Sequence, residues 1–295
     1  MAVKKIFITG GNGFVGNHLV SRLQKLNHHV VALKGQLEDW VNLKAQLCEN
    51  QWDVIIHLAG ISSPAKCESD PYLAYNANVL GTSLLLEAFK QSTKSVNNFD
   101  KTQFIFASTA QIYTIPDDGS AISETQPIKI RNVYGETKLE SELILESFSK
   151  RNNLKSTVLR LFNHSHISQS TDFFLPSIYH QIKNLNESEK NIFVGDLNIY
   201  RDIGTVPDLV NAFVSIVENL KQNSNFEIYN VCSGKNIKLE DLALMASKKL
   251  NREDVQFVVD KSRLREGDPK VVLGSFNKLK LATGWEPQVK FEDFF

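Results

Sequence analysis

Short apolar runs alternate with longer stretches of helical periodicity along the first half of the chain. The apolar runs predict buried strands at Val3–Thr9, Val30–Leu33, Val54–His57, Phe104–Ala107 and Ser156–Leu161. Between them, apolar residues recur three and four positions apart, which predicts helices at Phe14–Leu26, Leu37–Leu47, Leu73–Lys90 and Val133–Lys150. Asn132 is placed to cap the last helix. This alternation predicts an α/β fold with a doubly wound parallel sheet of Rossmann type.

After Leu161 the pattern becomes less regular, and residues 163–171 are polar and read as a loop. Helices are predicted at Phe173–Lys183, Leu209–Leu220, Leu239–Leu250 and Phe276–Ala282. Short strands are predicted at Ile192–Val194, Ile199–Ile203, Phe226–Val231 and Val255–Val259. We therefore expect residues 1–161 and about 204–231 to form the sheet domain. The remainder, about 162–203 and 232–295, is expected to form a smaller interleaved C-terminal α/β domain, or cap.

The balance of charges excludes some classes of function. The 295 residues carry 33 basic and 33 acidic side chains, which argues against a protein that mainly grips nucleic acid or an anionic membrane. No apolar run approaches the length of a membrane span. Cys48, Cys67 and Cys232 lie far apart and match neither a disulfide framework nor a zinc spacing. The initial apolar run is too short for a signal peptide, so we expect a soluble protein of the reducing cytoplasm.

A glycine-rich loop follows the first predicted strand and opens the first predicted helix. Gly10, Gly13 and Gly16 stand three residues apart. A dinucleotide pyrophosphate needs such a loop, because glycines permit a sharp turn and close backbone approach, and the helix start offers free N–H groups. A glycine turn without a ligand is the alternative. The position of the loop between strand and helix favours dinucleotide binding.

The end of the second predicted strand bears on which dinucleotide is bound. A carboxylate at this place binds the ribose diol of NAD, but the strand Val30–Leu33 is followed by Lys34 and Gly35. A lysine there would attract a 2′-phosphate. The sequence therefore favours NADP(H), with NAD(H) as the alternative and a solvated surface lysine as the other interpretation of Lys34.

A tyrosine and a lysine stand four residues apart on one face of a predicted helix. A phenol is a poor acid or base at neutral pH, and an ammonium beside it stabilises the phenolate and lowers its pKa. Tyr134 and Lys138 have this spacing, and Ser108 and Thr109 at the end of the fourth strand supply hydroxyl groups that can bind a substrate oxygen. An exposed helix pair is the alternative interpretation of Tyr134 and Lys138.

Together these motifs resemble the extended short-chain dehydrogenase/reductases that act on nucleotide sugars. The resemblance runs nearly end to end. It includes His57-Leu58-Ala59-Gly60, Asn78-Val79-Leu80-Gly81-Thr82, Ser108-Thr109, Arg160-Leu161-Phe162-Asn163-His164, Arg201-Asp202-Ile203 and Tyr229-Asn230-Val231.

The resemblance implies a role for each matching position. Tyr134 is then the general acid or base with Thr109 beside it, and Lys138 holds the nicotinamide ribose and tunes Tyr134. The implied cofactor contacts are Gly10, Gly13, Phe14, Val15, Gly16, Lys34, Leu37, Leu58, Ala59, Gly60, Asn78, Tyr134 and Lys138. Asn163 is implied to contact the diphosphate of the nucleotide sugar. Residues 36–39 depart from the Asp-Leu-x-Asp segment that often holds the adenine in this family.

Three reactions share this frame: 4,6-dehydration, 4-epimerisation and reduction of a 4-keto sugar. Dehydratases of the family carry a glutamate two residues after the catalytic threonine, whereas this chain has Gln111. A glutamine neither takes nor gives a proton at working pH, which disfavours dehydration. An epimerase retains its NAD, whereas a reductase consumes NAD(P)H and releases the product cofactor. Lys34 favours the reductase.

Parts of the second half resemble GDP-4-keto-6-deoxy-D-mannose reductases, namely residues 162–164, 172–178, 229–234 and 263–265. The resemblance implies reduction of the sugar C4 ketone by NAD(P)H to give GDP-D-rhamnose. Guanidinium groups suit a diphosphate, so Arg201, Arg263 and Arg265 are candidate ligands, with surface salt bridging as the alternative. A nucleotide-sugar 4-epimerase remains the main alternative function. A non-catalytic NADP(H) sensor is disfavoured because such proteins tend to lose the tyrosine or lysine.

Two further features complete the expectations. His164 and His166 form a His-x-His pair without a third partner at a useful spacing, so no metal site is predicted. In relatives, the helices that correspond to Leu73–Lys90 and Val133–Lys150 often form a four-helix seam. The resemblance therefore implies a homodimer.

Overall fold

The central sheet of the protein is fully parallel. The computed structural model describes residues 2–93, 99–221, 224–264, 267–288 and 294–295. Within them, six strands follow the order β10-β5-β4-β3-β1-β2. They are β1 (Lys5–Thr9), β2 (His29–Ala32), β3 (Val54–His57), β4 (Gln103–Thr109), β5 (Lys155–Leu161) and β10 (Phe226–Val231). The strand order reverses between β1 and β3, and ligands of such sheets bind beyond the carboxyl ends of the strands at this reversal.

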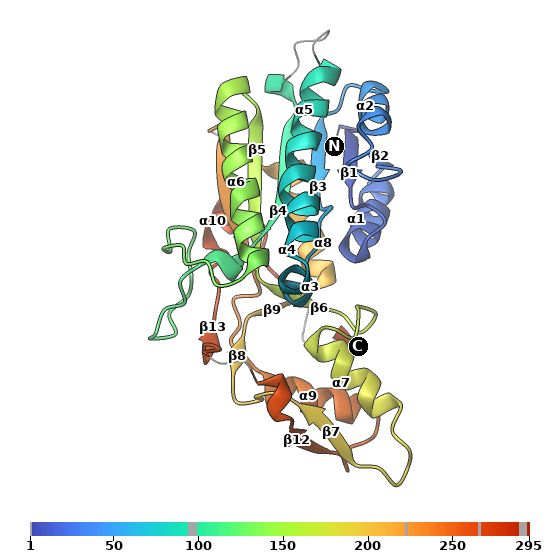
Figure 1. Ribbon diagram of the computed structural model, residues 1–295, viewed down its shortest axis with the longest axis vertical. Coiled ribbons are helices and arrows are strands. Elements are labelled where there is room, and N and C mark those ends of the chain that lie inside the picture. Colours follow the sequence, from blue (N-terminus) through green and yellow to red (C-terminus); the bar gives the residue numbers. More distant parts are fainter. Residues whose placement is uncertain (1, 94–98, 222–223, 265–266, 289–293) are drawn as a thin grey trace.

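Helices cover both faces of the sheet, which confirms the predicted doubly wound fold. Successive side chains of a strand point to opposite faces, so Ile6 and Ile8 enter one core and Phe7 enters the other. The first core lies under α1 (Phe14–Lys25), α8 (Val206–Asn219) and α10 (Asn277–Thr283). The second lies under α2 (Trp40–Cys48), α5 (Gly81–Thr93) and α6 (Val133–Asn152), and Figure 1 shows α5 and α6 side by side.

The helix predicted over Leu73–Lys90 contains a wide turn that the pattern does not show. α4 (Pro71–Tyr75), a π-helical turn (Asn76–Leu80) and α5 follow one another without a break, and the separate α3 (Pro64–Ser69) precedes them. The wide turn carries Asn78 inward, where its Oδ1 accepts the Ile61 N–H at 2.7 Å and its Nδ2 donates to Thr137 Oγ1 at 2.9 Å. Hydrophobic periodicity does not reveal such a turn, because the apolar face is nearly continuous through it. Single π turns often occur at functional sites.

A smaller α/β cap lies beyond the carboxyl edge of the sheet (Figure 1). Its elements are α7 (Phe174–Lys183), β7 (Asn191–Val194), β8 (Tyr200–Arg201), β11 (Ile237–Lys238), α9 (Leu239–Lys249), β12 (Gln256–Val259) and β13 (Val271–Val272). β7 pairs with β12, β11 and β13 flank β8, and the cap has an apolar core of its own. The chain leaves the cap for α8 and β10 and then returns, so the two parts interleave.

Two details differ from the sequence predictions. Residues 163–165 were predicted as loop but form β6 (Asn163–Ser165), which pairs with β9 (Ile203–Thr205). Three residues are too few to show the alternation of a strand. Helix α10, placed in the cap by the predicted boundary at 232–295, packs on the sheet instead, where Leu279 and Trp285 join the core under α8. Short 3-10 turns span Phe99–Lys101, Ala110–Ile112 and Lys261–Arg263.

Asp202 joins three segments where the cap meets the sheet. Its carboxylate accepts hydrogen bonds from the N–H groups of Ser233 (2.7 Å), Gly234 (2.9 Å) and Gly274 (3.1 Å) and from the Ser233 hydroxyl (2.7 Å). Burial raises the pKa of Asp202, and the bonds to Ser233 act in the opposite direction. The side chain therefore fixes the chain between β8 and β9 against the loops that follow β10 and β13.

Candidate active site

The glycine-rich loop between β1 and α1 leaves no room for side chains. Gly10 has a φ of +71°, and a Cβ there would lie 2.6 Å from the Ala59 nitrogen. A Cβ on Gly16 would lie 2.1 Å from the Gly10 carbonyl oxygen. Gly13 precedes the first turn of α1, whose start bears no side-chain cap. Its own N–H donates to Gly10 at 3.0 Å. The N-terminal amides of α1 are thus available to a phosphate at the strand-order reversal.

The segment after β2 holds Lys34 by its backbone and leaves its side chain exposed. The Lys34 N–H donates to Gln46 Oε1 at 3.0 Å, and its carbonyl oxygen accepts from Asn42 Nδ2 (2.6 Å) and Gln46 Nε2 (2.8 Å). The nearby carboxylate of Asp39 accepts the Asn42 N–H and caps α2. Leu37 is buried against Gly81 at the start of α5. A cation rather than a carboxylate is therefore presented at the end of β2.

A continuous chain of hydrogen bonds runs from β1 to the π turn through the buried His57. The Ala59 N–H approaches Thr9 Oγ1 at 3.4 Å, and Thr9 Oγ1 lies 2.6 Å from His57 Nδ1. His57 Nε2 lies 3.0 Å from Thr82 Oγ1, which donates to the Asn78 carbonyl oxygen at 2.6 Å. The Thr82 hydroxyl donates its only hydrogen to the Asn78 carbonyl oxygen, so it must accept from His57. His57 therefore donates from Nε2 to Thr82 and accepts at Nδ1 from Thr9.

His57 is held neutral in this chain of bonds. Its burial, and secondarily the charge of Lys138, lower the pKa of His57 to about 3. Gly60, three residues later, has a φ of +142°, and a Cβ there would lie 2.5 Å from Asn78 Oδ1. The segment from Leu58 to Gly60 is therefore fixed between the glycine loop and Asn78, close to where a cofactor would lie.

The structure brings Thr109, Tyr134 and Lys138 together, as their spacing predicts. Tyr134 and Lys138 lie on one buried face of α6. Thr109 lies at the carboxyl end of β4 and hydrogen-bonds Tyr134. Lys138 Nζ donates to the Ala107 carbonyl oxygen at 2.9 Å. Asn132 caps α6 as predicted, and the helix thereby begins just before the tyrosine.

Burial dominates the electrostatics of these groups. It raises the pKa of Tyr134 to about 12, and the hydrogen bond from Thr109 only partly offsets this effect. It also lowers the pKa of Lys138 to about 8, against the opposing influence of Cys67 and Glu142. The sequence-based expectation that Lys138 lowers the pKa of Tyr134 is therefore not met in the protein alone. A buried phenol of high pKa is a proton donor at neutral pH.

The residues proposed to bind substrate are distributed over the cap side. Asn163 is exposed on β6. Arg201 is nearly buried, and its guanidinium donates to Asp268 Oδ1 at 2.7 Å and to the Pro269 carbonyl oxygen at 2.8 Å. Arg263 is exposed and donates to the Phe193 carbonyl oxygen at 2.8 Å. Arg265 lies outside the described residues.

Arg131 is a further candidate residue, which the sequence reasoning missed. It precedes Tyr134 by three residues, and its guanidinium lies 3.5 Å from the Gln111 carbonyl oxygen. Burial lowers the pKa of Arg131, and the charge of Asp268 opposes this change. Two arginines from different parts of the fold, Arg131 and Arg201, are thus influenced by one carboxylate. The only signal in the sequence was a basic residue just before the tyrosine.

His18 and His166 lie close together near the start of α1. His166 Nδ1 lies 2.6 Å from the Ser168 hydroxyl, and its ring faces His18 at 5.9 Å between centroids. In the described part of the chain, no group of three or more His, Cys, Asp or Glu side chains could hold a metal ion. In the same residues, no helix is long and apolar enough to cross a membrane.

Comparison with known proteins assigns the chain to a family. A family model described as GDP-mannose 4,6 dehydratase matches residues 23–295. The chain belongs to this family, within the extended short-chain dehydrogenase/reductases. The match to the family model begins after the glycine loop. The prediction that this loop binds a cofactor therefore rests on the geometry of the loop.

Named relatives cover nearly the whole chain. The GDP-6-deoxy-D-mannose reductase of Pseudomonas aeruginosa is 28% identical over an alignment of 293 residues, which covers 97% of this chain and 93% of that protein. The UDP-glucose 4-epimerase of Streptococcus mutans is 27% identical and aligns with 98% of this chain and 92% of its own length. The structure of RMD from Pseudomonas aeruginosa complexed with NADPH has a TM-score of 0.87 at 27% identity, with 99% and 94% of the two chains covered. The chain is therefore an enzyme of the extended short-chain dehydrogenase/reductase family.

Proposed function

We propose that the protein reduces the C4 ketone of a nucleotide-linked 4-keto-6-deoxyhexose, in particular GDP-4-keto-6-deoxy-D-mannose to GDP-D-rhamnose. The observation that carries the proposal is the buried group of Thr109, Tyr134 and Lys138 at the carboxyl end of β4, on the same edge of the parallel sheet as the glycine-rich loop that follows β1. The likeness to the GDP-6-deoxy-D-mannose reductase of Pseudomonas aeruginosa supports the sugar and the base.

The proposed chemistry follows from the contacts of these three residues. When bound, NADPH supplies the hydride that reduces the C4 carbonyl carbon. Tyr134 donates its phenolic proton to the carbonyl oxygen, since its raised pKa keeps it protonated at neutral pH. Thr109 has one hydroxyl hydrogen, which it gives to Tyr134 in the protein alone and would turn to the same carbonyl oxygen when the substrate is bound. Lys138 binds the nicotinamide ribose and stabilises the phenolate that remains on Tyr134.

We propose NADP(H) as the preferred cofactor, with NAD(H) as the alternative. The exposed cation of Lys34 and the use of Asp39 as a helix cap support this preference. Gly10, Gly13, Gly16, Phe14 and Val15 would hold the pyrophosphate at the start of α1. Leu37, Leu58, Ala59, Gly60 and Asn78 would line the remaining path. RMD, which shares this fold, was solved with NADPH.

On the substrate side, we propose that Arg201 and Arg131 bind the diphosphate beside Asp268, together with Asn163 and the undescribed Arg265. Arg201 is supported by its place on β8, where Asp268 holds it in a fixed orientation. Arg263 is the weaker candidate because it lies exposed against Asp260 and the Phe193 carbonyl.

The two other reactions of the family make different demands on the site. Dehydration needs an acid or base where this chain has Gln111, whose Oε1 accepts from Asn132 at 3.1 Å. A 4-epimerase is the second candidate, since the epimerases of Streptococcus mutans and Lactobacillus helveticus are 27% and 25% identical to this chain. An epimerase returns its hydride and leaves the cofactor unchanged overall.

The assembly and the location of the protein are also proposals. A homodimer is supported by exposed apolar side chains on α4, the π turn and α6, namely Tyr72, Leu73, Leu80 and Leu143. A cytoplasmic location is supported by three free cysteines, of which Cys67 and Cys232 are buried. Light scattering of the purified protein tests the first of these proposals.

The deciding experiment follows reduced-nicotinamide absorbance with GDP-4-keto-6-deoxy-D-mannose. We expect loss of NADPH in proportion to the GDP-6-deoxyhexose formed. Interconversion of two C4 epimers at constant NADPH would support the epimerase and contradict the reductase. A panel of GDP-, UDP-, dTDP- and CDP-linked 4-keto sugars, each with NADPH and NADH, then tests the base and the cofactor.

A further inference from the structure

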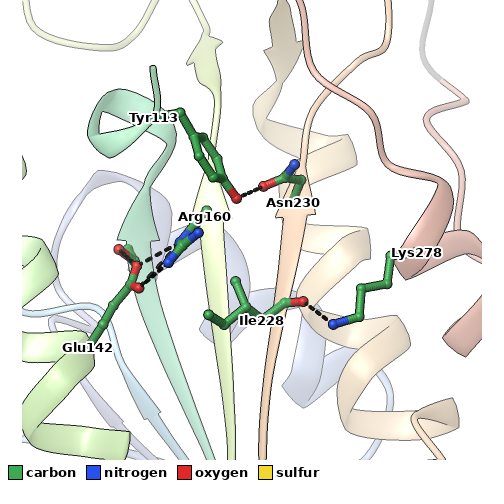
Figure 2. Close-up of polar contacts among 7 residues, drawn as sticks. Tyr113, Glu142, Arg160, Ile228, Asn230 and Lys278 are labelled. Carbon is green, nitrogen blue, oxygen red and sulfur yellow. Dashed lines mark hydrogen bonds and ion pairs between the residues drawn. The ribbon is translucent and has the colours of Figure 1, made fainter. Parts of the chain in front are cut away.

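A row of polar side chains crosses three adjacent strands just behind the catalytic residues. Ser108 on β4 pairs in register with Arg160 on β5, which pairs in register with Asn230 on β10. All three side chains are buried, and Figure 2 shows Arg160 lying between Glu142 of α6 and Tyr113. Ser108 directly precedes Thr109, so the row begins one residue from the catalytic hydroxyl.

Glu142 connects this row to the catalytic face of α6. It follows Lys138 by four residues, as Lys138 follows Tyr134, so the three share one helix face. Its carboxylate accepts from the Ser108 hydroxyl and from Arg160 Nη2 at 2.7 Å. Both members of the ion pair are less than 5% exposed. The residues Tyr134, Lys138 and Glu142 thus contact consecutive parts of the end of β4.

The row continues toward the cap. The Arg160 guanidinium lies 4.9 Å from the Tyr113 ring centroid, and the Tyr113 hydroxyl donates to Asn230 Oδ1 at 2.8 Å. Asn230 Nδ2 donates to the Ile122 carbonyl oxygen at 3.0 Å, which also accepts the Ser275 N–H at 2.9 Å. A series of contacts therefore links Glu142 to the segment that follows β13.

Fold stability alone is a weak reason for a buried ion pair. Removing two charges from water costs free energy, and a well-packed apolar pair often serves as well. Burial lowers the pKa of the Arg160 guanidinium, but its bonds to Glu142 outweigh this and raise it. Glu142 also raises the pKa of the nearby Lys138, which burial lowers. The carboxylate therefore acts on two cations, one of which belongs to the catalytic group.

We propose that Glu142 is a positioning residue, which holds Ser108 so that the Thr109 hydroxyl stays beside Tyr134, and which keeps Lys138 charged. Ser108 and Arg160 are its partners in this role. The inference rests on the proposed function for its reaction, but only on the Thr109, Tyr134 and Lys138 group for its geometry.

Three variants and one control test the proposal by steady-state kinetics, pH profiles and thermal unfolding. Ser108→Ala breaks one contact and leaves the ion pair intact, while Glu142→Gln removes the negative charge. We expect each to lower kcat by about tenfold or more, since small displacements of catalytic groups have effects of this size. Of these two variants, only Glu142→Gln should shift the alkaline limb of the pH profile to lower pH, because only it leaves Lys138 without the carboxylate. Glu227→Gln on β10, which breaks the ion pair with Lys278 of α10, is the control and should change neither.

The third variant separates positioning from stability. Glu142→Leu with Arg160→Met removes both buried charges, so its melting temperature should approach that of the wild type. We expect kcat to remain low in this double variant. Recovery of kcat together with stability would overturn the proposal, as would wild-type kcat in folded Ser108→Ala.

Failure of the proposed function would be visible separately. If the wild type epimerises sugars without consuming NADPH, the reductase is excluded, and the same variants are then measured by epimerisation. If Glu142→Gln does not fold, Ser108→Ala and the double variant decide the matter. If folded Glu142→Gln has the same pH profile as the wild type, the proposal that Glu142 keeps Lys138 charged is overturned.

Discussion

The candidate active site has a sheet side, which carries the proposed catalytic residues, and a cap side, which carries the proposed substrate-binding residues, and the two sides differ in burial. On the sheet side, Tyr134 and Lys138 are buried and each already has a partner, Thr109 or the Ala107 carbonyl oxygen. On the cap side, Arg201 is also buried and is held by an acidic partner, Asp268, while Asn163 and Arg263 are exposed. The groups proposed to perform the chemistry are therefore all buried, whereas only one of these three groups proposed to recognise the substrate is.

This difference has an energetic consequence. A buried lysine without a carboxylate partner at bonding distance costs free energy, which lowers the pKa of Lys138 to about 8, mainly through burial. Burying an arginine that is paired with Asp268 costs less free energy, because its charge is compensated before a substrate arrives. The sheet side therefore keeps an uncompensated charge, and the proposed diphosphate would have to replace the partner of Arg201.

The largest expected effect belongs to the sheet side. Replacing Tyr134 by phenylalanine removes the proton donor and leaves the ring packed, so we expect kcat to fall by about a thousandfold. NADPH binding, measured by fluorescence titration, should stay close to that of the wild type. Retention of full turnover would contradict the catalytic assignment of Tyr134.

A gain of stability should accompany loss of activity at Lys138. Below about pH 8 the lysine is charged in both the folded and the unfolded chain, so its burial penalty is present in full. Lys138→Met should therefore raise the free energy of unfolding at neutral pH by up to about 3 kcal/mol. From pH 8 to 10.5 the folded wild type loses the proton first and becomes relatively more stable, so the gap between the two proteins should close.

Urea unfolding of both proteins across this pH range checks the sign. The control is Lys150→Met on the same helix, where the lysine is exposed and pairs with Glu146. A surface change of this kind should stay within about 0.5 kcal/mol at any pH. A gap at Lys138 that persists unchanged at high pH would show that the effect comes from packing rather than from charge.

The cap side should respond in KM. Arg201→Ala removes a charged donor from the proposed diphosphate site, so we expect KM for the nucleotide sugar to rise by about tenfold or more. Arg263→Ala should change it by less than about threefold. Both are measured with saturating NADPH, and thermal unfolding checks that the Arg201 variant is folded. Equal losses in the two variants would place Arg263 in the site and would weaken the distinction drawn from their burial.

The sequence predicts the sheet side better than the cap side, for a physical reason. Thr109 ends a strand, and Tyr134 and Lys138 lie one helical turn apart, so their meeting follows from local structure and the parallel sheet. Asn132 is likewise a local signal, and it caps α6 as predicted. Such features can be predicted from the periodicity of a single helix or strand and from the edge of the sheet at which that element ends.

Features that depend on distant pairing could not be predicted. The charge of Asp268 acts on Arg131 only because the fold brings together two loops that are more than a hundred residues apart in the sequence. The inward turn at Asn78 depends on partners at Ile61 and Thr137 that no periodicity indicates. The buried pair of Glu142 and Arg160 likewise joins a helix to a strand through the sheet register.

Lys34 gives the smallest effect and the sharpest test of the comparison, since it is an exposed cation on the proposed cofactor side. Lys34→Ala should raise KM for NADPH by about tenfold, because a charge-assisted bond to the 2′-phosphate is lost. KM for NADH, which has no such phosphate, should not change. Lys44→Ala, on the neighbouring α2 where the lysine bonds Gln91, is the control. A fall in the preference for NADPH would show that recognition on this side too depends on an exposed group. An unchanged KM for both cofactors would make Lys34 a solvated surface residue and leave the cofactor preference to other residues of the path.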